Sequence, residues 1–315
     1  MTERYPILYR LAQMIALLFI TVAAVFPNLL TAVELPLAAL LIILLGIPHG
    51  ATDHLIFLHL HKIFIGGNRL IRFYATYLLL MGVYSLIWWL LPTGALILFL
   101  LLSAYHFGQS NWNYVGFEYK LSEKITFFIW GNLVLLFPIF WHYDAAIPII
   151  AEIIRKQPPA LALSLRYTLC IGLMIGNIFL VIYLRLRQSI TPRQLREEIA
   201  NLLLLCLMFV STPLLLGFVI YFVFWHSIGS IADQIHFFKQ RSRGYNWKSY
   251  MRQALPLSII AMTGIGLLYA VQFYGNGLLG IGLLFIFIAI VTLPHMILMD
   301  LLYSETAPEV HHSTA

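Results

Sequence analysis

Long apolar stretches separated by short polar turns run through the whole chain. The pattern predicts an all-α, polytopic membrane bundle, because in lipid a helix bonds its own backbone polar groups. Most stretches approach the ~20 residues that a helix needs to cross the hydrocarbon layer. We expect one transmembrane domain over residues 1–315, with a short polar tail at 303–315 and a short surface helix at 147–154. About ten transmembrane helices are predicted, at 7–27, 35–58, 72–92, 94–110, 123–141, 162–184, 197–212, 214–238, 255–273 and 278–302.

The composition strengthens the membrane interpretation. Hydrophobic residues make up 61% of the chain and charged residues 10%, whereas soluble domains average about 45–50% and about 25%. This excludes an ordinary soluble enzyme and a disordered chain. The two cysteines, Cys170 and Cys206, fall inside apolar stretches, which argues against a disulfide framework and a thiolate metal site.

The distribution of basic residues predicts the orientation. With the N-terminus inside, 16 of the 19 Lys and Arg residues fall on the cytoplasmic side. Cytoplasmic loops carry such an excess, so we expect both termini in the cytoplasm. No cleavable signal peptide is evident, and we expect a multi-pass protein of a bacterial cytoplasmic (inner) membrane.

Four histidines stand at one predicted depth. His49, His106, His226 and His295 lie in the second, fourth, eighth and tenth spans, all of which run from outside to inside. Their distances from the outer ends place them within roughly 8 Å of one level. Because four imidazoles from four helices can converge on one ion, we expect a metal site there. Five other histidines are expected at interfaces or in solvent: His59, His61, His142, His311 and His312.

Neighbouring residues refine this metal site. Proline precedes both His49 and His295 and is expected to bend each helix. Metal-bound imidazoles usually donate their second N–H to a polar group, and we expect Asp53, four residues after His49, as the best such partner. The remaining candidates are Asp233 and Gln109 as further partners of the ligands, and His54 and His236 as less favoured ligands that point elsewhere on their helices.

Four short stretches together resemble a known family. They are Gly46–His54, Tyr105–Gly108, Trp225–Ser227 and Leu293–Met296, and they resemble the Brp/Blh family of bacterial and archaeal membrane β-carotene 15,15′-dioxygenases. The resemblance implies a non-haem Fe(II) enzyme that cleaves the central double bond of β-carotene with O2, giving two molecules of all-trans-retinal. It also suggests a retinal-binding rhodopsin as the acceptor of the product.

The family's ligand histidines correspond to His49, His106 and His226, and no catalytic residue is expected beyond the metal ligands. One position departs from the family pattern, which has another His four residues after the third ligand. Here that residue is Ser230. A hydroxyl is a poor ligand for Fe(II), so we expect His295 to supply the fourth nitrogen.

Other function classes fit the residues less well. A haem protein needs two axial ligands on opposite sides of one pocket, whereas four histidines at one depth suit a single ion. A transporter would be expected to carry acidic residues at the middle of its spans, and none is evident. A non-catalytic partner of a retinal protein stays open as a third alternative.

Overall fold

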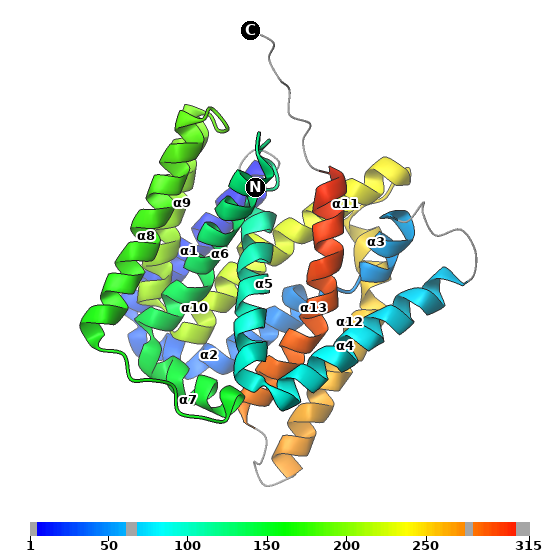
Figure 1. The fold of residues 1–315 in the computed structure, drawn as a ribbon, viewed down its shortest axis with the longest axis horizontal. Helices are drawn as coiled ribbons and strands as arrows, with labels where there is room; N and C mark the ends of the chain where they lie inside the picture. The colour runs from blue at the N-terminus through cyan, green and yellow to red at the C-terminus, as the bar shows by residue number, and fades with distance from the viewer. Residues whose placement is uncertain (1–4, 61–67, 275–279, 307–315) are drawn as a thin grey trace.

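The computed structural model describes residues 5–60, 68–274 and 280–306, and these ranges form a bundle of helices without strands (Figure 1). The N-terminal half comprises α1 (Pro6–Val25), α2 (Pro27–Leu41), η1 (Ile42–Gly46), η2 (Ile47–His49), α3 (Asp53–Leu60), α4 (Arg69–Leu90), α5 (Pro92–Trp112) and α6 (Lys120–Trp141). The C-terminal half comprises α7 (Tyr143–Ile154), α8 (Leu163–Leu186), α9 (Pro192–Ser211), α10 (Leu214–Tyr221), η3 (Phe222–Ser227), α11 (Ile228–Arg241), α12 (Trp247–Tyr274) and α13 (Ile281–Thr306).

Each of the ten predicted spans coincides with an α-helix or with two α-helices joined by π-helical or 3₁₀ turns. Within the described ranges, nine helical segments are long and apolar enough to cross a membrane. The tenth segment, α9, is not among them, because its first two turns carry Arg193, Arg196, Glu197 and Glu198. The predicted surface helix at 147–154 is present as α7, which begins earlier, at Tyr143. The protein is therefore an all-α, multi-pass membrane protein.

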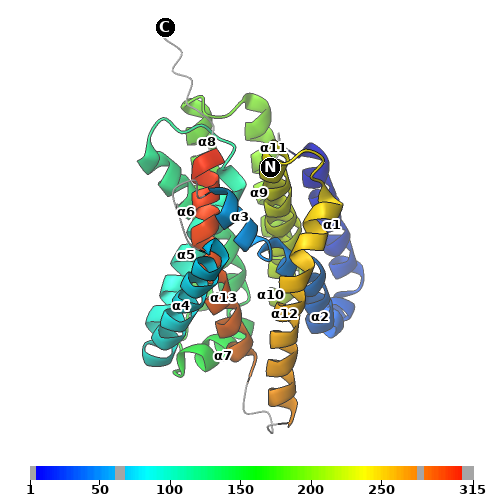
Figure 2. The same cartoon turned by 90° about the vertical axis from the view of Figure 1, so that its right-hand side faces the viewer.

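The two ends of the described chain lie at the same end of the bundle. Figures 1 and 2 show α1 beginning and α13 ending there, as an even number of crossings requires. The predicted tail at 303–315 begins too early, because α13 continues to Thr306 and Tyr303 is buried. Residues 307–315 of that tail lie outside the described ranges.

The second and eighth spans are not continuous α-helices. In the second, a π-helical turn (η1) and a 3₁₀ turn (η2) separate α2 from α3, and Pro48 and His49 lie in the 3₁₀ turn. In the eighth, the π-helical turn η3 joins α10 to α11 and carries His226. The sequence predicted a bend at Pro48 but no change of winding at His226. In the tenth span, α13 continues through Pro294.

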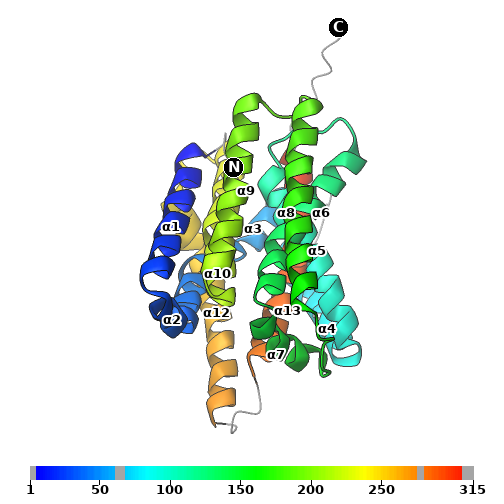
Figure 3. The same ribbon diagram turned by 90° about the vertical axis from the view of Figure 1, so that its left-hand side faces the viewer.

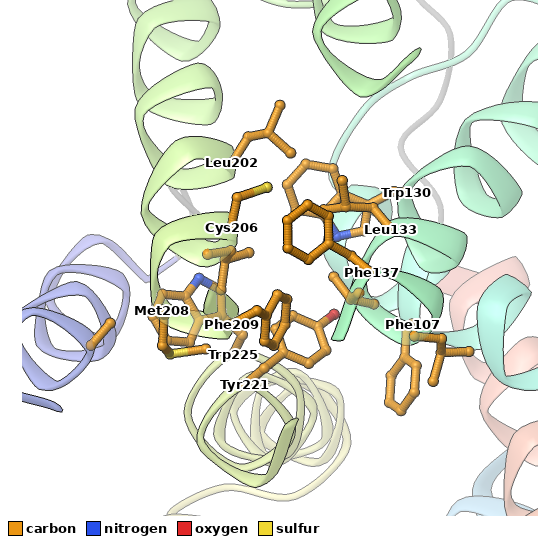
Figure 4. Close-up of a cluster of buried hydrophobic side chains, with 14 of the residues drawn as sticks. Phe107, Trp130, Leu133, Phe137, Leu202, Cys206, Met208, Phe209, Tyr221 and Trp225 are labelled. Atoms are coloured by element: carbon orange, nitrogen blue, oxygen red, sulfur yellow. The ribbon is translucent and has the colours of Figure 1, made fainter. Parts of the chain in front are cut away.

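A large apolar core packs beside these irregular turns. Figure 4 shows side chains of α5, α6, α9, α10 and η3 meeting in one cluster, among them Phe107, Trp130, Phe209 and Trp225. Phe107 and Trp225 are the chain neighbours of His106 and His226, so the packed core fixes the backbone next to both histidines. The indole N–H of Trp225 also donates to the side chain of Asn201 on α9, at 2.9 Å.

Candidate functional site

The four histidines from the even-numbered spans lie together in the structure. The centroid of the His49 ring is 5.3 Å from that of His226 and 4.8 Å from that of His295. The centroid of the His106 ring is 4.8 Å from that of His226 and 5.5 Å from that of His295. All four side chains are buried. We call this group the four-histidine cluster.

Hydrogen bonds fix which ring nitrogen faces the cluster at two of the positions. His49 donates from Nδ1 to the Gly46 carbonyl, and His295 donates from Nδ1 to the Asp53 carboxylate at 2.9 Å. These oxygen atoms can only accept, so a neutral ring carries its proton on Nδ1 and leaves a lone pair on Nε2. Both rings therefore hold the tautomer that binds a metal through Nε2.

Three of the four rings have buried nitrogen atoms without a hydrogen-bond partner among the described residues. Both nitrogens of His106 are in this state, as are Nδ1 of His226 and Nε2 of His295. Buried polar atoms are normally bonded, because an unpaired polar group costs free energy away from water. Several unpaired nitrogens in one place are the pattern expected of side chains that are arranged to bind an ion.

Three of the four spacings between neighbouring rings also fit a metal, and the 5.5 Å spacing of His106 and His295 is slightly wider. A metal–nitrogen bond of about 2.1 Å puts neighbouring imidazole centroids about 4.6–5.3 Å apart for ligand angles between about 90° and 110°. Yet, among the described residues, no three or more His, Cys, Asp or Glu side chains are arranged as a ready metal-binding set. The four rings stand edge to face instead. Binding would therefore require the rings to turn about χ2, which is a soft torsion in histidine.

Apolar and small residues surround the cluster. The Phe222 ring lies 5.4 Å from the ring of His49, and the Phe107 ring lies 4.7 Å from that of His226. Gly50 packs against the His295 ring, where a Cβ would come within 3.5 Å of Nδ1. These neighbours surround the cluster with apolar contacts.

Asp53 bonds to a different histidine from the one that the sequence suggested. The spacing of four residues pointed to His49, but the change to 3₁₀ winding separates the two side chains. The carboxylate of Asp53 instead accepts from His295 and, at 3.0 Å, from the hydroxyl of Tyr77. Asp53 thus joins the second span to α4 and α13.

The other two predicted partners bond away from the four rings. Gln109 donates to Asp300 at 2.7 Å, and Asp300 also accepts from the Tyr105 hydroxyl. Asp233 accepts from the amide of Asn113 at 3.0 Å. Neither side chain has a hydrogen bond to a cluster histidine among the described residues.

His54 and His236 are not part of the cluster. The His54 ring lies 6.5 Å from that of Phe73, on α4, and His236 is exposed and bonds to Gln240 at 3.0 Å. Of the histidines expected at interfaces, His59 and His142 bond to backbone carbonyls. The remaining three, His61, His311 and His312, lie outside the described residues.

Ser230 is buried one turn after His226 and accepts a hydrogen bond from Gln234 at 3.2 Å. Gln234 also donates to the His49 carbonyl at 2.8 Å, and its own oxygen accepts from Thr52 at 2.5 Å and from Tyr250 at 3.1 Å. This amide therefore uses all four of its hydrogen-bonding positions. We call Thr52, Gln234 and Tyr250 the amide clasp.

The amide clasp is the part of the site that the sequence analysis missed. It holds the turn that carries His49, since the hydroxyl of Tyr250 also lies 3.0 Å from the Pro48 carbonyl and 3.2 Å from the His49 carbonyl. Gln234 alone left a signal, as a polar residue in an apolar span. Thr52 and Tyr250 follow no spacing that would connect them with a histidine.

Comparisons with known proteins agree with this picture. A protein named β-carotene 15,15′-dioxygenase from uncultured marine bacterium 66A03 is 27% identical over 275 residues, which cover 84% of this chain and 93% of that relative. A Halobacterium salinarum protein named probable β-carotene 15,15′-dioxygenase Blh is 26% identical over 221 residues, 65% of this chain and 63% of that relative. No solved structure matches the chain. The family model described as β-carotene 15,15′-dioxygenase matches residues 40–303, a range that holds all four cluster histidines. The chain therefore belongs to the β-carotene 15,15′-dioxygenase family.

Proposed function

We propose that this enzyme is a membrane-embedded, non-haem iron dioxygenase that cleaves the central double bond of β-carotene with O2 to give two molecules of all-trans-retinal. The observation that carries the proposal is the four-histidine cluster, in which four buried ring nitrogens have no hydrogen-bond partner among the described residues. Membership of the family and the name of the marine bacterial relative support the substrate and the reaction. A retinal-binding rhodopsin is the proposed acceptor of the product.

The chain's own residues prepare the site for iron. His49, His106, His226 and His295 would hold the ion as neutral imidazoles, and no carboxylate ligand is needed. The Gly46 carbonyl fixes the tautomer of His49, and Asp53 fixes that of His295. When bound, Fe(II) supplies the chemistry that activates O2.

The apolar residues around the cluster suit a hydrocarbon substrate. β-Carotene has no polar group to be recognised, so apolar contact and shape must position its central double bond. Phe107 and Phe222 lie against the cluster rings and exclude water from the reacting carbons. Because the substrate dissolves in the bilayer, we expect it to enter from the lipid side of the bundle.

Expression in a β-carotene-producing bacterium tests the proposal. We expect the orange colour to fade, retinal to appear by chromatography, and the purified protein to contain about one iron per chain, as one ion among four imidazoles implies. His106→Ala should lose both iron and retinal. The matched control, His236→Gln, removes an exposed histidine outside the cluster and should keep both.

Each part of the proposal can fail separately. Products longer or shorter than retinal would contradict central cleavage but not iron. A haem absorption spectrum, or full iron content in His106→Ala, would contradict the four-histidine site. Unchanged β-carotene with iron bound would contradict the substrate.

A further inference from the structure

A basic groove lies between α1 and α9, two helices that carry none of the cluster histidines. It has a volume of about 470 Å³ and is lined by Arg10, Gln13, Arg193, Arg196 and Glu197, with Tyr9 among its walls. The two helices pack directly against each other, as Figure 3 shows, and the buried Tyr9 donates to the Glu197 carbonyl at 3.3 Å.

The groove has an excess of positive charge. Three arginines face one glutamate, so its formal net charge is +2. Arg193 forms an ion pair with Glu197 at 2.8 Å. Arg10 and Arg196 are exposed, and neither pairs with a carboxylate in the part of the chain that the structure describes. Two guanidinium groups are thus available to an anion.

The same surface becomes apolar further along both helices. Positions seven residues apart lie on one helix face, about 10.5 Å apart. Leu17 therefore lies on the same face of α1 as Arg10, and Leu203 lies on the same face of α9 as Arg196. The side chains of the two leucines are 52% and 48% exposed. Figure 3 shows that both helices begin at the same end of the bundle. Because each leucine follows its arginine by seven residues, both leucines are further from that end than the arginines. The surface is therefore basic at one end and apolar below it.

We infer that this groove binds the headgroup of a phospholipid with net negative charge, with its acyl chains along Leu17 and Leu203. A free phosphate ion would use only the basic end and would leave the apolar continuation without a role. A zwitterionic lipid would bring its own cation into a groove that already carries excess positive charge. Basic pockets between transmembrane helices on the cytoplasmic side bind anionic lipids in this manner, and the predicted orientation places this end of α1 and α9 in the cytoplasm.

Native mass spectrometry of the detergent-purified protein tests the inference, with phosphatidylglycerol, phosphatidylcholine and inorganic phosphate as probes. One basic residue near the lipid surface changes affinity about fivefold. The double variant R10Q/R196Q should therefore bind phosphatidylglycerol about 30-fold more weakly. The matched control K248Q/R252Q removes two charges from the start of α12, outside the groove, and should bind like the wild type. R10K/R196K keeps the charge and should retain most of the affinity.

Three results would overturn the inference. These are equal affinity of R10Q/R196Q and K248Q/R252Q for phosphatidylglycerol, equal affinity of the wild type for the two lipids, and displacement of the lipid by inorganic phosphate. Because both arginines are exposed, their removal leaves the packing of α1 on α9 in place. Should the double variant elute as aggregate, the single variants R10Q and R196Q test the same binding, each with an expected loss of about fivefold.

Discussion

Removing the amide of Gln234 should release the turn that carries His49. Gln234→Leu keeps the apolar bulk but removes four hydrogen bonds, to the His49 carbonyl, Ser230, Thr52 and Tyr250. Three of these bonds join α11 to other segments, whereas Ser230 lies on α11 itself. Hydrogen bonds between transmembrane helices average about 0.6 kcal/mol each, so the loss is about 1.8 kcal/mol. The Gln234 side chain is fully buried, and water is therefore not expected to replace the lost partners.

The assay combines stability with metal content. Unfolding of the iron-free protein in detergent should show a loss of about 1.8 kcal/mol, and iron content after reconstitution should fall because His49 is no longer held in place. A buried amide elsewhere, Asn177, donates to the carbonyls of Ile129 and Leu173 and serves as the control. Asn177→Leu loses one bond between helices, to Ile129 on α6, so it should cost about 0.6 kcal/mol and leave iron content unchanged.

The two variants separate a positioning role from general stability. If Gln234→Leu and Asn177→Leu lose iron in proportion to their lost stability, the amide clasp has no special role in holding His49. The reasoning is also refuted if Gln234→Leu unfolds as the wild type does, because the four bonds would then contribute nothing.

Two further predictions follow from individual contacts. Asp53→Asn removes the carboxylate that accepts from His295. The affinity of this variant for iron, measured by competition with a chelator, should fall about 10–100-fold. The control variant His236→Gln should keep the wild-type affinity, and an unchanged affinity in Asp53→Asn would show that this bond does not matter. Gly108→Ala would place its Cβ onto the backbone of α6, whereas a Cβ at Gly172 would meet open space. The yield of folded protein, measured by size-exclusion chromatography, should fall for Gly108→Ala and stay unchanged for Gly172→Ala. Equal yields would contradict the close packing of α5 on α6.

The sequence was sufficient to predict the architecture and the gathering of four histidines. Both depend on one-dimensional quantities, namely the length of apolar stretches and the number of residues from a span end to each histidine. The depth argument assumed regular helices. The argument still holds with a π-helical turn at His226, because one wide turn changes the depth of a histidine by less than the roughly 8 Å over which the four predicted depths are spread.

What the sequence could not provide was the pairing of side chains. The expected contact of Asp53 with His49 relied on a regular helix with 3.6 residues per turn, and the 3₁₀ turn at His49 removed that regularity. The observed partner, His295, is 242 residues away, and no spacing rule connects two residues so far apart. The role of each histidine as a metal ligand stays a prediction that iron analysis must test.

The irregular turn at His49 explains why these distant contacts exist. A turn that leaves α-helical winding frees backbone carbonyls, and in a membrane the freed groups must find partners inside the protein. The His49 carbonyl accepts from Gln234 on α11. The hydroxyl of Tyr250 on α12 lies 3.0 Å from the Pro48 carbonyl, which also accepts from the backbone N–H of Ala51. The backbone that presents His49 is thus bonded to helices formed about 185–202 residues later in the chain. It follows that the four short motifs of the family are not sufficient to build the cluster. A chain with the same four histidines but without the amide clasp would lose the bond that Gln234 donates to the buried His49 carbonyl, and His49 would follow whichever winding satisfied that carbonyl.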